Sequence, residues 1–197
     1  MLLHGNTQIN LDDTLNDDAI FVLTVDGTHF RTRECRKEPN ANWFSYKFHG
    51  PGLSYEFGIA IHKNQLCWIN GPFRASSHDA VIFDSKEGDF DDPITKFRSP
   101  DGLASRIPEG KMGFGDNGGY SKFKSKVSTR DKMDEKDVYE YKNRALARHE
   151  IFNGRVKTWR MMSDTWIHAL DKHIIVLEAI CVIEQYRMEN GHPLLDV

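Results

Sequence analysis

Three acidic residues are placed where carboxylates could take part in phosphoryl transfer. Asp26 and Asp116 each follow an apolar run and precede Gly-containing sequence, and Glu150 lies in a long helix-forming segment. Flexible backbone beside a carboxylate lets a metal ion and a phosphate approach closely. Oxygen ligands without a Cys/His cluster suit Mg²⁺ or Mn²⁺ rather than zinc. We therefore predict that this triad binds two such ions, which at about 4 Å apart would clamp the attacking and leaving oxygens of an in-line displacement.

Each acid also has a purely structural interpretation. Asp26 and Asp116 are residues typical of turns, and a lone Glu150 in an Arg-rich helix commonly forms a surface ion pair. Only their joint placement favours a site. Asp79 is a fourth candidate, interpreted first as an acid favoured by a helix N-terminus and second as a further metal ligand.

The segments that must position these acids include several short strands. The β-branched run 19–25 predicts a strand that ends at Asp26, and the glycine-diluted run 111–115 predicts another that ends at Asp116. Residues 43–70 predict an antiparallel meander that Gly71-Pro72 closes. The meander comprises strands 43–48, 53–62 and 65–70.

Helices fill most of the remaining chain. Residues 76–79 offer N-cap side chains to a helix at 80–83, and long helices are predicted over 138–162 and 166–189. Residues 84–110 are expected to be an excursion outside the core, and 121–137 a basic loop. Ala147 and Gly154 lie on the same helix face as Glu150 and are small. They predict that this face lies close against the sheet. This pattern predicts an α/β or α+β fold with a central mixed sheet flanked by helices.

Composition narrows the class of protein. The chain has 197 residues, a net charge of −3 and 39% hydrophobic residues, enough for one packed core. Acids dominate 11–18 and 84–92, whereas Lys and Arg outnumber acids in 120–160, an asymmetry typical of one polyanion-facing side. Three cysteines without a C-x-x-C pair favour a reducing compartment, and the most apolar stretch, 174–183, is too short to span a membrane. We expect a soluble intracellular protein.

Four motifs together resemble a known family. They are Val25-Asp26-Gly27-Thr28, His78-Asp79, Gly115-Asp116 followed by Gly and Tyr120, and Asn143-Arg144-x-x-x-Arg148-x-Glu150-x-x-x-Gly154-x-x-Lys157. The set is similar to the DDE superfamily endonucleases of PIF/Harbinger-type transposases, with the helical signature its most specific part.

The resemblance implies an RNase H-like nuclease domain over 19–162, after an acidic leader at 1–18 and before a C-terminal helix at 163–197 that packs on it. It implies a DDE triad of Asp26, Asp116 and Glu150 with two Mg²⁺ or Mn²⁺ ions, cleaving and joining DNA. Arg144, Arg148 and Lys157 would hold DNA phosphates. Members of the family often rely on a Myb-like DNA-binding accessory protein for nuclear entry, so the resemblance further implies nuclear localisation and such a partner. The sequence leaves the oligomeric state open, an oligomer included.

Family members usually carry a helical DNA-binding region before the first Asp, whereas 25 residues precede Asp26 here. Three alternatives therefore remain open. The chain is an active nuclease, a domesticated or truncated module that binds DNA or protein without catalysis, or a fragment that folds poorly by itself.

Overall fold

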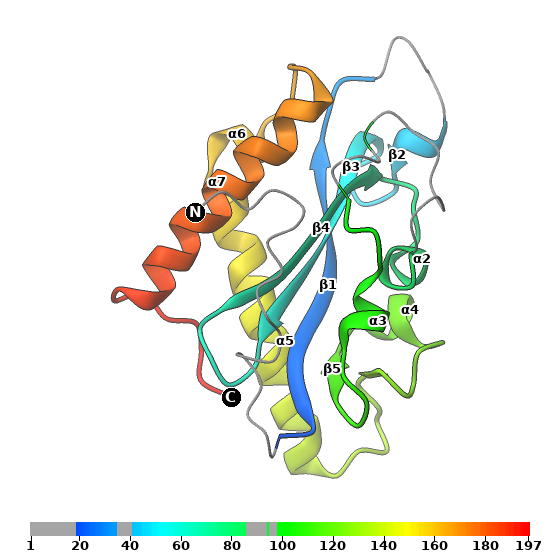
Figure 1. The fold of residues 1–197 in the computed structure, drawn as a ribbon, viewed down its shortest axis with the longest axis vertical. Helices are drawn as coiled ribbons and strands as arrows, with labels where there is room; N and C mark the ends of the chain where they lie inside the picture. The colour runs from blue at the N-terminus through cyan, green and yellow to red at the C-terminus, as the bar shows by residue number, and fades with distance from the viewer. Residues whose placement is uncertain (1–18, 35–40, 86–93, 95–97) are drawn as a thin grey trace.

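The structure, a computed structural model, describes residues 19–34, 41–85, 94 and 98–197. In this part of the chain a six-stranded mixed sheet is flanked by helices, consistent with an RNase H-like fold and confirming the predicted fold class (Figure 1). The strands are β1 (Phe21–Arg31), β2 (Phe44–Ser45), β3 (Gly50–Ala60), β4 (Leu66–Arg74), β5 (Met112–Phe114) and β6 (Val127–Ser128). The helices are η1 (Ala41–Trp43), α2 (Asp79–Phe83), α3 (Leu103–Arg106), α4 (Asn117–Tyr120), α5 (Lys136–Thr158), α6 (Arg160–Ser163) and α7 (Leu170–Glu189).

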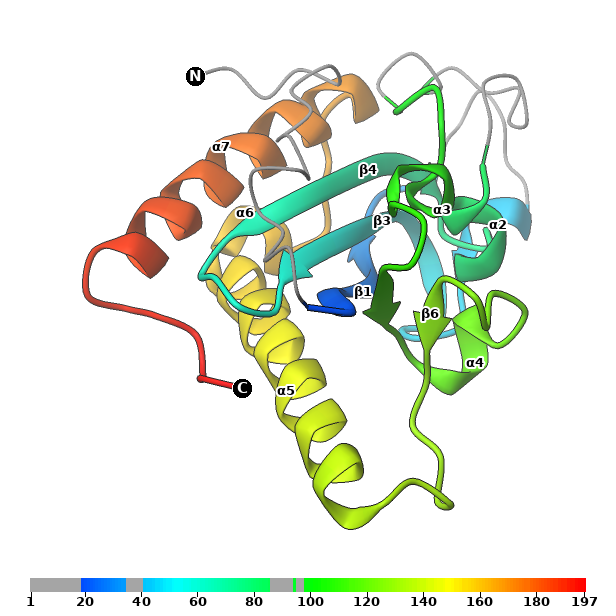
Figure 2. The ribbon, with the colours of Figure 1, turned by 60° about the horizontal axis from the view of Figure 1, so that its bottom comes forward.

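The sheet is built around β1, which pairs antiparallel with β3 and parallel with β5. β3 also pairs antiparallel with β2 and β4, and β5 pairs parallel with β6. The predicted antiparallel meander over 43–70 is thus confirmed. Figure 2 shows the sheet between two groups of helices, with α5 and α7 on one side and α2, α3 and α4 on the other.

Two strands run further than their sequence patterns predicted. β1 continues five residues beyond Asp26 to Arg31, because residues 26–31 pair with β3. Asp26 therefore lies in mid-strand, and the prediction that the strand ends there is wrong. β4 likewise passes through Gly71-Pro72 to Arg74. A φ of +139° at Gly71, which glycine adopts without steric cost, lets the strand continue.

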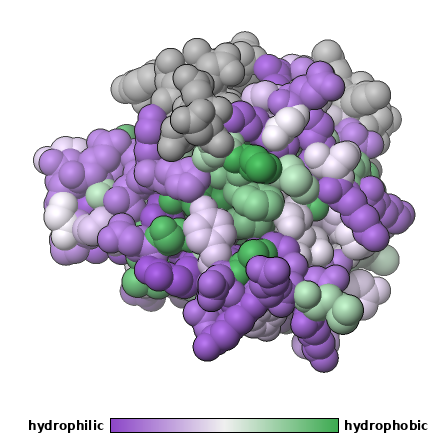
Figure 3. All heavy atoms as spheres, turned by 90° about the horizontal axis from the view of Figure 1, so that it is seen from below, coloured by the Kyte–Doolittle hydropathy of each residue, from purple (hydrophilic) through white to green (hydrophobic). Residues whose placement is uncertain are grey.

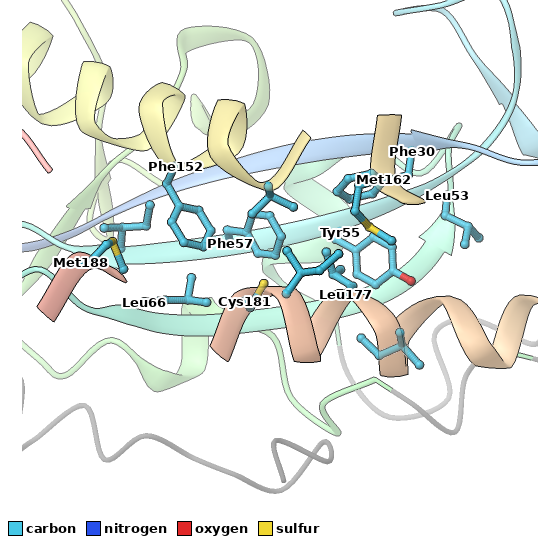
Figure 4. Close-up of a cluster of buried hydrophobic side chains, with 14 of the residues drawn as sticks. Phe30, Leu53, Tyr55, Phe57, Leu66, Phe152, Met162, Leu177, Cys181 and Met188 are labelled. Atoms are coloured by element: carbon cyan, nitrogen blue, oxygen red, sulfur yellow. The ribbon is translucent and has the colours of Figure 1, made fainter. Parts of the chain in front are cut away.

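The larger core cluster fills the space between the sheet and the helices α5 and α7 (Figure 4). Phe152 of α5 meets Phe57 of β3 edge to face at a centroid distance of 5.5 Å. Leu177 and Cys181 of α7 pack on the same cluster. Phe152 is therefore a core residue. Cys67 and Cys181 are also buried, while Cys35 lies outside the described residues.

A second cluster lies on the opposite face of the sheet. It joins Val25 of β1 to Phe83 of α2, Leu103 of α3 and Tyr120 of α4. Leu103 belongs to the stretch 84–110, so the prediction that this whole stretch lies outside the core is wrong. Its apolar residues are few and widely spaced, which is why they gave no periodic signal.

Helix α5 turns a different face to the sheet from the one predicted. Ala145, Phe152 and Val156 are buried, whereas Glu150 and Gly154 are exposed. A Cβ atom added at Gly154 would have no neighbour within 4 Å. Small side chains therefore do not mark the packed face, because larger apolar residues fill the gap to the sheet.

The surface agrees with the composition. Polar side chains cover most of the end of the molecule seen in Figure 3, around a smaller apolar group. Among the described residues there is no helix with the length and apolarity needed to cross a membrane.

Candidate active site

Asp26 is held in the middle of β1 by contacts on both of its carboxylate oxygens. Oδ1 accepts a hydrogen bond from the Gly27 N–H at 2.8 Å, and Oδ2 accepts one from Asn153 Nδ2 of α5 at 3.3 Å. Burial raises the pKa of Asp26, against the opposing effect of the nearby Lys47 ammonium. The charge of Asp116 raises this pKa further. An anion shielded from water beside a second anion is a favourable environment for a cation.

The parallel register of β1 and β5 brings Asp116 level with Asp26. Thr24 of β1 pairs with Phe114, the last residue of β5. Asp26 lies two residues after Thr24, and Asp116 lies two residues after Phe114. Asp116 follows β5, as predicted, and caps α4 through a 2.8 Å hydrogen bond from the Asn117 N–H to its Oδ1. The same oxygen lies 3.6 Å from a guanidinium nitrogen of Arg130. Asp116 is exposed, unlike Asp26, and so remains open to a ligand.

Asp79 joins this pair from the first turn of α2. Its carboxylate lies over two glycines, since a Cβ atom at Gly27 would fall 2.3 Å from Asp79 Oδ1 and one at Gly119 would fall 2.9 Å from Asp79 Cβ. Burial raises the pKa of Asp79, Lys47 lowers it, and the charges of Asp26 and Asp116 raise it. Three carboxylates from three elements thus influence one another.

The helix cap at α2 explains how Asp79 is positioned. His78 is the N-cap residue, and its Nδ1 accepts a hydrogen bond from the Ala80 N–H at 3.2 Å. The sequence interpretation of Asp79 as a helix N-terminal acid is therefore confirmed. His78 acts on the backbone, although its charge also lowers the pKa of Asp79.

Glu150 lies beside this group rather than within it. The residues on either side of it along α5 are fixed to β1, because His149 Nδ1 lies 2.9 Å from Thr24 Oγ1 and Asn153 bonds to Asp26. The Glu150 side chain itself is exposed. Its charge acts on His149 and Lys157, and it is not among the main influences on Asp26. Within the described ranges, no three His, Cys, Asp or Glu side chains already form a group that could hold a metal ion.

Two lysines supply positive charge to the acidic group. Lys47 Nζ donates a 2.9 Å hydrogen bond to the Gly27 carbonyl and is the main attractive charge for both Asp26 and Asp79. Lys157 Nζ lies 5.9 Å from the centroid of the Phe30 ring, and its charge also acts on Asp26. Partial burial and the like charge of Lys47 lower the pKa of Lys157. The sequence singled out Lys157 but not Lys47, which a return of the chain through β2 brings close.

The two arginines predicted to bind phosphate contact protein backbone instead. The Arg148 side chain is buried, with its residue only 3% exposed, and donates to the carbonyls of Ala60, Lys63 and Leu195. Arg144 donates to the carbonyl of Asp196 at 2.7 Å. Burial argues against the phosphate role predicted for Arg148, whereas Arg144 is exposed and its phosphate role stays a prediction. A buried guanidinium with three backbone acceptors is a structural group.

A buried polar layer lies on the α2 face of the sheet and was missed by the sequence analysis. Glu56 of β3, the register partner of Gly27, is 1% exposed, and one carboxyl oxygen accepts a 2.8 Å hydrogen bond from Trp68 Nε1. Burial and the charges of Asp79 and Asp26 raise its pKa to about 8. The fully buried Tyr120 hydroxyl feels the same charges, which with burial raise its pKa. A lone Glu in the apolar run of β3 was the available signal.

This arrangement defines a class of protein. Carboxylates lie beside the adjacent parallel strands β1 and β5 of a mixed sheet that helices flank, an architecture consistent with an RNase H-like fold. A family model described as DDE superfamily endonuclease matches residues 25–185, and the chain belongs to this family. The match contains all four acids, without distinguishing the PIF/Harbinger subtype. Searches of curated proteins and of solved structures gave no match.

Proposed function

We propose that the protein is a transposase-derived, divalent-metal-dependent endonuclease that cleaves DNA. The observation that carries the proposal is the convergence of Asp26, Asp79 and Asp116, whose charges act on one another. Family membership supports DNA as the substrate and divalent ions as cofactors.

Asp26, Asp116 and Glu150 are the residues we propose to hold Mg²⁺ or Mn²⁺, with Asp79 as a further ligand. Carboxylate oxygens are the donors that these ions prefer. When bound, two such ions would polarise the scissile phosphate and activate the attacking oxygen. Asn153 fixes one oxygen of Asp26, and Asp116 presents its carboxylate at the surface.

Lys47 and Lys157 are the phosphate-binding side chains of this proposal. Both lie close enough to Asp26 to alter its pKa. A DNA backbone approaching the carboxylates would meet their positive charge first, which offsets repulsion between phosphate and acids. Arg148 has no part in this contact because it is buried and bonds to backbone carbonyls, whereas the exposed Arg144 remains a further candidate.

Nicking of supercoiled plasmid in the presence of Mg²⁺ or Mn²⁺ tests the proposal. We expect wild type to nick, and Asp26→Asn and Glu150→Gln to lose nicking. Glu140→Gln is the matched control, because Glu140 is an exposed acid on the same helix about 15 Å away. Nicking that survives in Glu150→Gln would refute the role of that residue. Equal loss in Glu140→Gln would show that the assay reports on the helix as a whole.

Metal binding is measured separately from cleavage. We expect Mn²⁺ to raise the melting temperature of wild type, but not of Asp26→Ala. A wild-type chain that binds DNA and Mn²⁺ without nicking any substrate would instead indicate the domesticated binding module. A wild-type chain whose melting temperature is insensitive to Mn²⁺ would exclude the metal site.

Nuclear localisation and a Myb-like DNA-binding partner belong to the proposal through the family resemblance alone. Imaging of the tagged full chain, with and without a co-expressed Myb-like protein, tests both. Nuclear accumulation that depends on the partner is the expected outcome, and a cytoplasmic distribution in both cases would contradict it.

A further inference from the structure

Helix α7 is apolar on two opposite sides. One side faces the core through buried residues that include Ile174, Leu177 and Cys181. The outward side carries Ile175, Val182 and Tyr186, which are 50%, 41% and 66% exposed. A helix that is apolar all round is typically covered on both sides, and clustered exposed apolar residues mark interaction surfaces.

The outward residues follow the spacing of a coiled-coil seam. Ile175, Ala179, Val182 and Tyr186 are separated alternately by four, three and four positions. Lys172 lies three positions before Ile175, and Glu189 lies three positions after Tyr186, so both residues continue this alternation. A repeat of 3.5 residues keeps one stripe facing a partner helix as the pair supercoils. We refer to these six residues as the α7 seam.

The charges at the two ends of the α7 seam identify the partner. Lys172 and Glu189 are both exposed, and Glu189 also accepts a hydrogen bond from Gln185 on the same helix. A parallel copy of the helix would place Lys172 against Lys172 and Glu189 against Glu189. An antiparallel copy, related by a twofold axis, places each Lys172 against a Glu189 of the other chain, so the seam is complementary to itself.

We propose that two copies of this chain associate through an antiparallel pairing of their α7 seams. In this pairing, residues at equal distances from the two ends of the α7 seam face each other across the twofold axis. Ile175 therefore packs on Tyr186 of the second copy. Ala179 meets Val182 of the second copy near the axis, where the small alanine lets the helices approach closely. The amphipathic Tyr186 ring is suited to a partly exposed interface.

The location of α7 leaves the acidic group accessible in such a dimer. In Figures 1 and 2, α7 lies on the side of the molecule away from α2 and α4. Asp79 is in the first turn of α2, and Asp116 is the N-cap residue of α4. The pairing is therefore independent of the proposed nuclease activity, and either can fail without the other.

Analytical ultracentrifugation of the full chain between about 1 and 200 μM tests the association, a range chosen for small interfaces of micromolar affinity. We expect a monomer–dimer equilibrium in wild type. Ile175→Glu should weaken the dimer at least about tenfold because it buries a charge in the seam. Ile167→Glu is the matched control, since Ile167 is 53% exposed but lies before α7. Circular dichroism melting curves verify that each variant is folded.

Charge reversal tests the orientation. Lys172→Glu alone and Glu189→Lys alone should each weaken the dimer about two- to tenfold, because each creates like-charge pairs across the axis. An equimolar mixture of the two variants should associate again, since every end pair then has opposite charges. A monomeric wild type throughout the range would overturn the proposal. So would equal weakening by Ile167→Glu and Ile175→Glu, or single reversals without effect.

Discussion

At the scale of single residues, Glu56 is a buried carboxyl close enough to Asp26 and Asp79 for their charges to raise its pKa. Its Oε1 has one partner, Trp68 Nε1, and its Oε2 is buried without a hydrogen-bond partner among the described residues. Burial and neighbouring carboxylates raise its pKa to about 8. Glu56 is therefore neutral at neutral pH, which limits the negative charge that the folded chain must accommodate around Asp26.

This raised pKa predicts a pH-dependent stability. The folded chain holds the Glu56 proton up to about pH 8, whereas the unfolded chain releases it near pH 4.5. The stabilising contribution is complete below pH 4.5 and is lost as pH rises to about 8, by up to about 1.4 kcal/mol per pH unit. Glu56→Gln removes this dependence. Urea unfolding of both proteins at pH 5, 7 and 9 should show the variant gaining on wild type as pH rises; parallel pH profiles would contradict a raised pKa.

Two glycines, Gly27 in β1 and Gly154 in α5, are expected to respond oppositely to alanine. Gly27→Ala places a Cβ atom 2.3 Å from Asp79 Oδ1, so Asp79 must move. We expect a loss of about 1–3 kcal/mol in the free energy of unfolding. Gly154→Ala meets open space in the interior of α5 and should stabilise the chain by about 0.5–1 kcal/mol.

The same pair tests the place of Asp79 in the metal site. If the Asp79 carboxylate contributes to ion binding, Mn²⁺ stabilises the Gly154→Ala variant as it does wild type, and stabilises Gly27→Ala less. Thermal melts with and without Mn²⁺ measure the difference. Equal Mn²⁺-induced shifts in the two variants would assign Asp79 a purely structural role at the start of α2.

At the scale of elements, α5 connects the sheet to the C-terminal segment through its arginines. Arg148 bonds to the carbonyls of Ala60 and Lys63 at the β3–β4 turn and to Leu195, while Arg155 bonds to the carbonyls of His192 and Pro193. These two arginines of α5 thus donate hydrogen bonds to backbone carbonyls of other segments. A count of basic residues in the sequence therefore does not by itself give the charge available to a ligand.

Removing these guanidinium groups separates a structural role from a DNA-binding role. Arg148→Met leaves three carbonyls without their donor and should cost about 2–4 kcal/mol of unfolding free energy. Arg144→Met, at an exposed position with one backbone acceptor, should cost less than about 1 kcal/mol. Chemical denaturation measures both. Weakened DNA binding by a fully stable Arg148→Met variant would restore the phosphate role predicted from sequence.

The strands and helices also show which structural features the sequence patterns predicted correctly and which they did not. The apolar run before Asp26 identified β1, and the parallel register then brought Asp116 level with it, as the joint-site prediction required. The end of β1 was misplaced because residues 26–31 become a strand only by pairing with β3. The packed face of α5 was misplaced because it depends on which side chains fill the gap to the sheet. Neither property is encoded locally.

Lys47 and Glu56 illustrate the same limit within the site. Lys47 is distant from Asp26 in sequence and is brought close by the return of the chain through β2 and β3. Glu56 gave a visible signal, an acid in an apolar strand, but its neighbours follow from the fold. The three aspartates could be proposed from sequence because each sits next to its own local motif. Lys47, whose charge acts on two of them, and Glu56, whose pKa responds to them, could not.

At the scale of the whole molecule, charge separates into regions despite a net value of −3. The exposed Lys122 and Lys124 follow α4, which begins directly after Asp116. Lys47 and Lys157 come from other elements, and their charges act on Asp26. A DNA backbone that reached both Asp26 and the segment after α4 would meet all four lysines, and its affinity should be largely electrostatic.

Salt dependence provides the test of this picture. Each phosphate contact releases condensed counterions, so the logarithm of affinity falls with the logarithm of salt concentration by about 0.9 per contact. Lys122→Gln with Lys124→Gln should lower DNA affinity and reduce this slope by about 1–2, because one or two contacts are removed. Fluorescence anisotropy of a labelled duplex at several salt concentrations measures both quantities. Reduced affinity with an unchanged slope would mean that these lysines act through the fold and that the DNA takes another path to Asp116.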